Sequence, residues 1–345
     1  MQEALTKEQV RQAINFGGKT PQTISFWLHP DAYSENSEKE KVKSLLEEYP
    51  SDILLLSAGM PGYGKSSQPN NPSYVWGIPK QSESSAIDAQ LLISDWNELD
   101  GFLAAFPKAS KEAVITNPAK IAAADKTNRY RLGHFWYFFY ERLWSFRGME
   151  NTLIDMHTNP DEIKRLFEVL SDFYIEVIEH LSDELGCDGF FVSDDLGSQQ
   201  NLMFSPEMFR TLFKPFYAKV IEACHKKGMH FWLHTCGNVE SIIPDLIEVG
   251  VDVLHPIQKH TMDEAVIANK YRKDLCFMCG MDVQQTMPFG SVDEVRSEVR
   301  HLIETFSKDG GRVIFSMGNG ITPNIPVENL QALYEELYKF RSDVK

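Results

Sequence analysis

The sequence predicts an α/β fold: a (β/α)8 TIM barrel that forms one domain over residues 1–345, with a long insertion in its N-terminal third. Three observations predict it. Short apolar runs alternate with amphipathic helical stretches, which is typical of a parallel sheet covered by helices. Eight such runs occur along the chain, which favours a closed barrel over an open sheet. No stretch has the composition of a linker between domains.

The predicted strands are short apolar runs, and several end at Gly, Pro, Asp or Asn, which are residues that terminate strands. In chain order they are Thr23–Leu28, Ile53–Ser57, Arg131–Tyr137, Gly189–Ser193, His230–His234, Val251–His255, Leu275–Gly280 and Arg312–Ser316.

Helical periodicity fills the intervals between these strands. Within Asp161–Leu185, apolar residues recur on one stripe, and Pro160 and Gly186 suit the start and the end of a helix. The segment Ser57–Lys126 breaks this rhythm because it is rich in Pro, Gly, Ser and Asn, so we expect an insertion that shapes the active-site mouth. The other predicted helices are Pro206–Lys227, Val239–Val249, Val292–Phe306 and Pro326–Phe340.

Composition excludes several classes of protein. With 34 basic and 49 acidic side chains the net charge is −15, which disfavours a binder of nucleic acid or of an anionic membrane. No apolar run approaches the roughly 20 residues that span a bilayer. The N-terminus lacks the apolar core of a signal peptide, and the five cysteines are an odd number. We therefore expect a cytoplasmic protein without a disulfide framework.

The segment Gly59–Ser66 matches the phosphate-loop pattern G-x-x-x-x-G-K-[ST]. Such a loop must run directly into a helix whose N-terminal amides hold the phosphates. Pro69 and Pro72 follow it and argue against that helix. We therefore predict a glycine-rich loop at a strand end and no nucleotide site.

The pair His234 and Cys236 is the strongest indication of chemistry. They lie two apart where a predicted strand ends, so both side chains point to the same side, and imidazole and thiolate are preferred zinc ligands. The pair alone is equally compatible with a buried histidine beside an inert cysteine. A catalytic zinc usually takes three protein ligands, and Cys279 is the first choice for the third because it also ends a strand. Cys276 is expected to face the opposite side.

Two adjacent carboxylates, Asp194 and Asp195, follow another predicted strand, and alternation allows only one of them to face the barrel centre. We favour Asp194 as a catalytic acid or metal-site partner and Asp195 as a substrate contact; a helix cap or loop salt bridge is the structural alternative. His255 ends a strand and is a candidate for proton handling, although a satisfied rim histidine fits equally well. Gln258 and Asn319 are candidate substrate-binding residues.

Several motifs resemble the uroporphyrinogen decarboxylase superfamily from about Arg147 to the end of the chain, and this resemblance implies a (β/α)8 barrel. They are Ser193–Gln199, Ser205–Phe209, Lys214–Phe216, Leu233–Val239, Ile243–Gln258, Gly280–Gln284 and Pro323–Asn329.

The superfamily has two chemical branches. Its decarboxylases hold porphyrinogen carboxylates with arginines in an N-terminal segment, whereas the similar segment here, Phe26–Tyr33, contains none. The other branch contains cobalamin-dependent methyltransferases with a zinc-binding His-x-Cys pair, which His234 and Cys236 match. The methylthiol:coenzyme M type adds a cysteine in the last glycine-rich loop, where this chain has Asn319. The subgroup that demethylates methoxylated aromatics or other donors is therefore more similar.

The resemblance implies a zinc-dependent methyltransferase that moves a methyl group between a small substrate and a corrinoid protein. Zinc and a corrinoid carried by that partner are then the expected cofactors. The resemblance implies His234 and Cys236 as metal ligands, and Cys279, chosen above for its place at a strand end, is the expected third. The aromatic run Phe135–Tyr140 is expected to serve mainly as core, and part of it could wall a pocket for a flat donor. The alternatives are a uroporphyrinogen decarboxylase-type enzyme of tetrapyrrole biosynthesis and a barrel that binds a ligand without catalysis.

Overall fold

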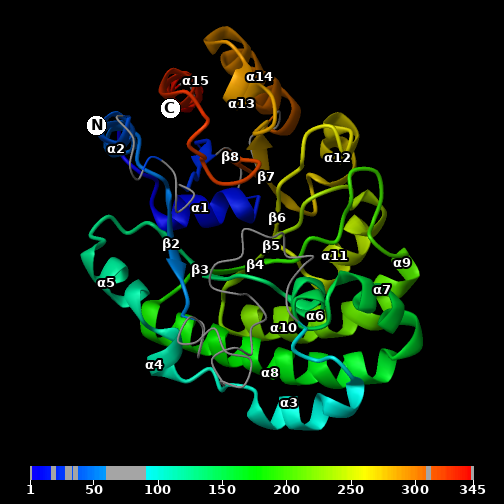
Figure 1. Ribbon diagram of the computed structural model, residues 1–345. Coiled ribbons are helices and arrows are strands. Elements are labelled where there is room, and N and C mark those ends of the chain that lie inside the picture. The colour runs from blue at the N-terminus through cyan, green and yellow to red at the C-terminus, as the bar shows by residue number, and fades with distance from the viewer. Residues whose placement is uncertain are drawn as a thin grey trace.

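A computed structural model describes residues 2–16, 21–27, 33, 38–59, 91–307 and 312–342. All eight strands are parallel neighbours in one sheet, in the order β1-β8-β7-β6-β5-β4-β3-β2, so the predicted barrel is confirmed. Figure 1 shows the strands at the centre with the helices around them. The strands are β1 (Thr23–Ile24), β2 (Ile53–Ser57), β3 (Tyr130–Phe135), β4 (Gly189–Ser193), β5 (His230–His234), β6 (Val253–His255), β7 (Cys276–Met281) and β8 (Val313–Met317).

One aspartate joins the two edge strands and so nearly closes the barrel. The backbone N–H of Asp52 donates to the carbonyl of Ile24 at 2.9 Å, and the Asp52 carboxylate accepts from the N–H of Ile24 at 2.7 Å. The same carboxylate accepts from the N–H of Leu5 and pairs with Arg341, both at 2.7 Å. This buried carboxylate therefore ties β1 to β2 and to the C-terminal helix.

The helices cover the outside of the barrel, and the long helix predicted over Asp161–Leu185 is confirmed, with observed bounds Pro160–Leu185. The described helices are α1 (Lys7–Ile14), α2 (Lys39–Glu48), α3 (Leu99–Ala105), α4 (Lys111–Val114), α5 (Asn117–Ala124), α6 (Phe139–Arg147), α7 (Met149–Thr158), α8 (Pro160–Leu185), α9 (Pro206–Met208), α10 (Lys214–Lys226), α11 (Ile243–Val249), α12 (Glu264–Tyr271), α13 (Thr286–Phe289), α14 (Val292–Phe306) and α15 (Val327–Ser342). None of those described is long and apolar enough to cross a membrane.

Two differences from the predicted helices have physical causes. The helix predicted over Pro206–Lys227 contains a π-helical turn at Phe209–Phe213 before α10 begins. Pro215, in the first turn of α10, has no N–H to donate to the preceding turn, so the regular α-helical ladder is broken there. The helix α6 was not predicted. All nine of its residues are buried, polar ones such as Glu141 and Arg142 included, so it is not an ordinary amphipathic helix with one exposed face.

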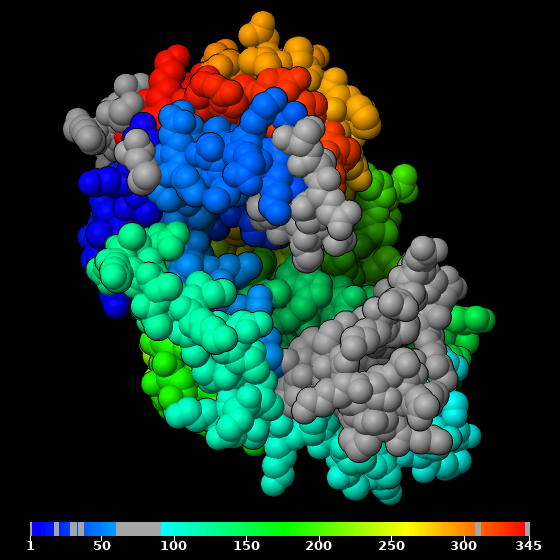
Figure 2. Space-filling view, turned by 60° about the vertical axis from the view of Figure 1, so that its left-hand side comes forward, coloured from blue at the N-terminus to red at the C-terminus, as the bar shows by residue number. Residues whose placement is uncertain are grey.

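The segment predicted as an insertion contains the short helices α3, α4 and α5 within its described residues, and all three contact α8. In Figure 2, the blue-green segment that carries α4 and α5 borders a hollow on one face of the molecule, opposite the blue N-terminal segments. The phosphate-loop pattern at Gly59–Ser66 lies outside the described residues except for Gly59.

The barrel interior is apolar towards the amino ends of the strands and polar at their carboxyl ends. Its apolar cluster includes Phe191, Trp232, Val253 and Ile314, and three residues from α1 and the segment before it close its lower end. Because side chains on one face of a strand recur every second residue, the next inward positions are two residues further along. They are His134, Ser193, His234, His255, Gly280 and Ser316. This polar layer lies at the mouth where barrel enzymes place their active sites.

Candidate metal centre at the barrel mouth

Three potential ligands meet where β4 and β5 end. These strands are neighbours, with Ser193 beside His234, so Asp195 comes next to the His234–Cys236 pair. His234 Nε2 lies 3.4 Å from Cys236 Sγ and 3.5 Å from Asp195 Oδ1. The three ligand atoms all lie within 4.8 Å of one another, and within the described ranges this is the group of His, Cys, Asp and Glu side chains that could hold a metal ion.

These spacings fit zinc. With usual bond lengths, a tetrahedral zinc ion holds nitrogen and sulfur ligands about 3.6 Å apart and nitrogen and oxygen ligands about 3.4 Å apart. The two distances from His234 Nε2, 3.4 Å to Cys236 Sγ and 3.5 Å to Asp195 Oδ1, differ from these values by about 0.2 Å or less. Imidazole, thiolate and carboxylate together are also a donor set that zinc accepts.

Two glycines allow the loops that carry these ligands to approach closely. A Cβ atom on Gly197 would lie 2.7 Å from the carbonyl oxygen of Cys236, and one on Gly237, whose φ is +83°, would lie 2.4 Å from the carbonyl carbon of Gly197. In this narrow space the backbone N–H of Cys236 donates to Asp195 Oδ1 at 2.8 Å. Gln258 accepts a hydrogen bond from the N–H of Gly237 at 2.7 Å and so holds the same loop.

Burial controls the charges of these groups. It lowers the pKa of His234 to about 3, with His134 adding to the effect, so this imidazole is neutral. Burial raises the pKa of the Cys236 thiol, and the nearby carboxyl groups of Asp195 and Glu141 raise it further. A bound divalent cation reverses this effect because it stabilises thiolate and carboxylate directly. The protein groups therefore favour a cation at this point.

His255 lies beside the three potential ligands His234, Cys236 and Asp195. It is the neighbour of His234 across β5 and β6, and the Nδ1 atoms of the two rings are 2.8 Å apart. The Nε2 atom of His255 lies 2.9 Å from the carbonyl oxygen of Met317 at the end of β8. The indole of Trp27 packs against the His255 ring with centroids 5.2 Å apart.

The structure brings Asp195, rather than Asp194, to His234 and Cys236. Asp194 is fully buried behind the strand, where Oδ1 accepts from the backbone N–H of Glu141 at 2.8 Å and the Tyr217 hydroxyl donates to Oδ2. Burial raises the pKa of Asp194 to about 7. Its contacts anchor the start of α6 against α10. This structural role corresponds to the helix cap that was the alternative to a catalytic role for this carboxylate.

Cys279 does not lie with His234, Cys236 and Asp195. It belongs to the buried cluster between the strands and the outer helices, together with Phe277 and Phe315. Cys276 instead packs inside the barrel, with Met278. The two cysteines do face opposite sides, as expected, but the inward one is Cys276, near the start of β7 and away from the mouth. All five cysteines of the chain are free thiols.

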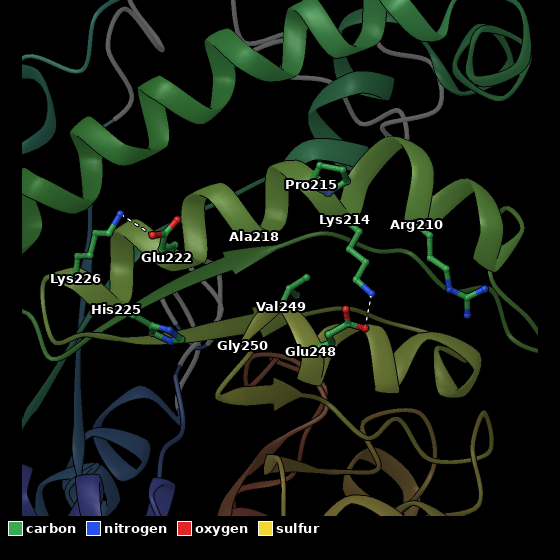
Figure 3. A pocket seen from close by; sticks show the side chains of 10 residues that line it. All are labelled: Arg210, Lys214, Pro215, Ala218, Glu222, His225, Lys226, Glu248, Val249 and Gly250. Atoms are coloured by element: carbon green, nitrogen blue, oxygen red, sulfur yellow. Dashed lines mark hydrogen bonds and ion pairs between the residues drawn. The ribbon is translucent and has the colours of Figure 1, made fainter.

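The candidate substrate residues Gln258 and Asn319 line a cavity of about 170 Å³ that also reaches Cys236. Backbone and side chains of β7 and the loops after β6, β7 and β8 form its walls. A second, wider groove lies outside the barrel between α10 and α11, where Figure 3 shows Lys214 paired with Glu248. Arg210 pairs with Asp245 there. Because Arg210 and Lys214 are both paired with carboxylates, the groove is less suited to an anionic ligand.

Two further residues at the mouth were missed by the sequence reasoning. Glu141 of α6 is buried, and its carboxylate accepts from the Ser193 hydroxyl. Burial, Asp195 and Asp194 raise its pKa well above the usual range. His134 has an Nε2 atom that is buried without a hydrogen-bond partner among the described residues. The available signal for Glu141 was a charged residue directly after the aromatic run Phe135–Tyr140, whose last two residues begin α6.

The chain is similar to several known proteins. The family model described as uroporphyrinogen decarboxylase (URO-D) matches residues 144–340. A methylcobamide:CoM methyltransferase, MtaA, of Methanosarcina barkeri is 26% identical over 151 residues, which are 44% of this chain and 41% of that protein. A uroporphyrinogen decarboxylase of Ruthia magnifica is 22% identical over 199 residues, covering 54% of this chain and 51% of the relative.

These alignments span about two fifths to one half of the length of the curated relatives. Among solved structures, a methyltransferase from Methanosarcina mazei superposes with a TM-score of 0.65 at 16% identity, covering 98% of this chain and 99% of that one. At this identity the superposition shows a common fold.

Proposed function

The chain belongs to the uroporphyrinogen decarboxylase family, and we propose that it is a member of the methyltransferase branch: a zinc-dependent methyltransferase that moves a methyl group between a small substrate and a corrinoid protein. The observation that carries this proposal is the convergence of His234, Cys236 and Asp195, whose potential ligand atoms all lie within 4.8 Å of one another. The M. barkeri relative is named for methyl transfer from a methylated cobamide, which supports the corrinoid partner.

In this proposal the metal ligands are His234, Cys236 and Asp195. Asp195 takes the third place, in which the sequence reasoning put Cys279, because its Oδ1 atom lies 3.5 Å from His234 Nε2 whereas Cys279 packs against the outer helices. Three protein ligands leave one position for a substrate atom, as catalytic zinc sites do. When bound, zinc supplies Lewis acidity that activates a thiol acceptor or stabilises the departing oxygen or sulfur of a methyl donor.

The surrounding side chains suit a small polar substrate. Gln258 and Asn319 offer amide groups at the cavity that reaches Cys236. The unpartnered Nε2 of His134 is a buried polar atom that a substrate atom could satisfy. Trp136 lies with its ring centroid 5.2 Å from that of His234, which gives a flat donor such as a methoxylated aromatic a ring to pack against.

The chain lacks the arginines with which a uroporphyrinogen decarboxylase would hold its substrate. A porphyrinogen carries many carboxylates, which need fixed cations, and the segment Phe26–Tyr33 contains no arginine. A binding protein without catalysis would be recognised by the absence of both products in the assay below.

One experiment distinguishes a methyltransferase, a decarboxylase and a binding protein without catalysis. Purified protein is incubated with reduced corrinoid protein and a panel of methoxyarenes, methylamines and methylthiols, and methyl-cobalt formation is followed by absorbance. Uroporphyrinogen is offered in a parallel reaction. We expect methyl-cobalt formation that is lost in Cys236→Ala and in Asp195→Ala and is retained in the matched control Cys279→Ala. Coproporphyrinogen formation without a methyl-cobalt signal would establish the decarboxylase instead, and neither product would favour a binding barrel.

A further inference from the structure

We propose that His255 is a positioning residue that fixes the tautomer of His234, so that the lone pair of His234 Nε2 faces Cys236 and Asp195. The proposal rests on the proposed function only in taking the metal to be zinc. The tautomer itself is a property of the metal-free protein.

The derivation starts at the carbonyl of Met317, which can only accept a hydrogen bond. The His255 Nε2 atom lies 2.9 Å from this oxygen and must therefore carry the proton. A neutral imidazole has one protonated nitrogen, so the Nδ1 atom of His255 has a lone pair. His234 Nδ1 is 2.8 Å from it and must donate. The Nε2 atom of His234 is then unprotonated, 3.4 Å from Cys236 Sγ and 3.5 Å from Asp195 Oδ1.

This chain of donors requires that His255 is neutral, because a cationic ring would donate from both nitrogens and reverse the direction. The His255 side chain is 0% exposed and that of His234 is 2% exposed. One nitrogen of His255 faces His234 and the other faces a neutral carbonyl, so neither faces a carboxylate. A buried cation without an adjacent anion is strongly disfavoured.

The arrangement is held by the barrel itself. His234 and His255 are register partners in adjacent strands, and Met317 is the last residue of β8. The rings of Trp27 and Phe191 pack against His255 with centroids 5.2 and 6.1 Å away. The acceptor for His234 Nδ1 therefore has little freedom to turn. Partners of this kind fix the orientation of a metal-binding histidine and raise its basicity.

The first test is the tautomer in metal-free protein, measured by long-range proton–nitrogen correlation NMR with labelled histidine. We expect His234 protonated at Nδ1 and His255 protonated at Nε2. A His234 ring protonated at Nε2 would overturn the proposal. This result is independent of whether the protein uses zinc.

The second test is zinc affinity, measured by competition with a chromophoric chelator. His255→Phe keeps the ring but removes both hydrogen bonds, and we expect zinc binding weaker by about 10- to 100-fold. His255→Gln can accept from His234 and donate to Met317, so it should recover most of this loss. Zinc binding by folded His255→Phe that equals the parent would overturn the proposal.

A control separates positioning from general loss of stability. His230, at the other end of β5, is also buried and has two hydrogen-bond partners, Tyr130 and Asn15, each at 3.0 Å. His230→Phe should destabilise the fold but leave zinc affinity unchanged. Equal weakening of zinc binding by the two substitutions would contradict a specific role for His255. If the parent protein binds no zinc, the proposed function fails, and the tautomer measurement alone decides this inference.

Discussion

Replacing Gly237 with alanine tests the close contact of the two loops that bring the proposed ligands together. The new Cβ atom would lie 2.4 Å from the carbonyl carbon of Gly197 and 2.6 Å from the carbonyl oxygen of Ser198. Carbon atoms pack at about 3.5 Å or more, so the loops must separate by about 1 Å. The 2.8 Å hydrogen bond from Cys236 to Asp195 spans the same space and would break. Zinc ligand distances tolerate only about 0.2 Å, so zinc affinity should fall as well.

The energetic cost has two parts. An alanine at the φ of +83° found at Gly237 costs about 1–2 kcal/mol. The steric overlap adds about 1–3 kcal/mol, which gives a total of about 2–5 kcal/mol. Gly228 is the matched control, because its φ is +69° and a Cβ there would have no heavy atom within 4 Å. Gly228→Ala should therefore lose only about 1–2 kcal/mol and keep full zinc affinity.

The assays are urea denaturation followed by circular dichroism, for the free energy of unfolding, and zinc titration against a competing chelator. Equal destabilisation by the two substitutions would refute the steric part of the reasoning. Parent-like zinc affinity in folded Gly237→Ala would refute the link between loop contact and metal binding.

Two further predictions concern buried carboxylates. Asp52→Ala removes the carboxylate that pairs with Arg341 and accepts from two backbone N–H groups where the barrel closes. It should lower the free energy of unfolding, measured by urea denaturation, by about 3–5 kcal/mol. A loss below about 1 kcal/mol would contradict the role of Asp52 in joining β1 to β2. Burial raises the pKa of Asp194 to about 7 in the folded protein, compared with about 4 in the unfolded chain. Its protonated form therefore stabilises the fold fully below about pH 4, and this stability is lost as the pH rises through about 7. Urea denaturation between about pH 5 and pH 8 should therefore show a fall in stability that is smaller in Asp194→Asn by at least about 1 kcal/mol, and identical pH profiles would refute this prediction.

The sequence predicted those features that depend on short-range pattern. The strand at His230–His234 is bounded by Gly228 and the loop after it, and its observed limits equal the predicted ones. The placement of His234 beside Cys236 needed only the alternation of side chains along extended backbone. Both were therefore available without knowledge of the fold.

Features that depend on which face of a strand is inward were not predictable in this way. Strands of a barrel are buried on both faces, so the run Leu275–Gly280 is apolar throughout and carries no polar alternation that would set its phase. Sequence reasoning therefore chose Cys279 over Cys276 as the inward residue, and for the same reason it chose Asp194 over Asp195. Glu141 reaches the mouth from a wholly buried helix, which periodicity could not identify.

The most direct test of the central claim, that His234, Cys236 and Asp195 form a zinc site, is the zinc content of protein purified without chelators. Elemental analysis should find about one zinc per chain in the parent and in Cys279→Ala, and a strongly reduced content in folded Cys236→Ala and Asp195→Ala. Parent protein that contains no zinc and does not take up added zinc would contradict the account. Zinc lost from Cys279→Ala but retained in Asp195→Ala would contradict the assignment of the third ligand.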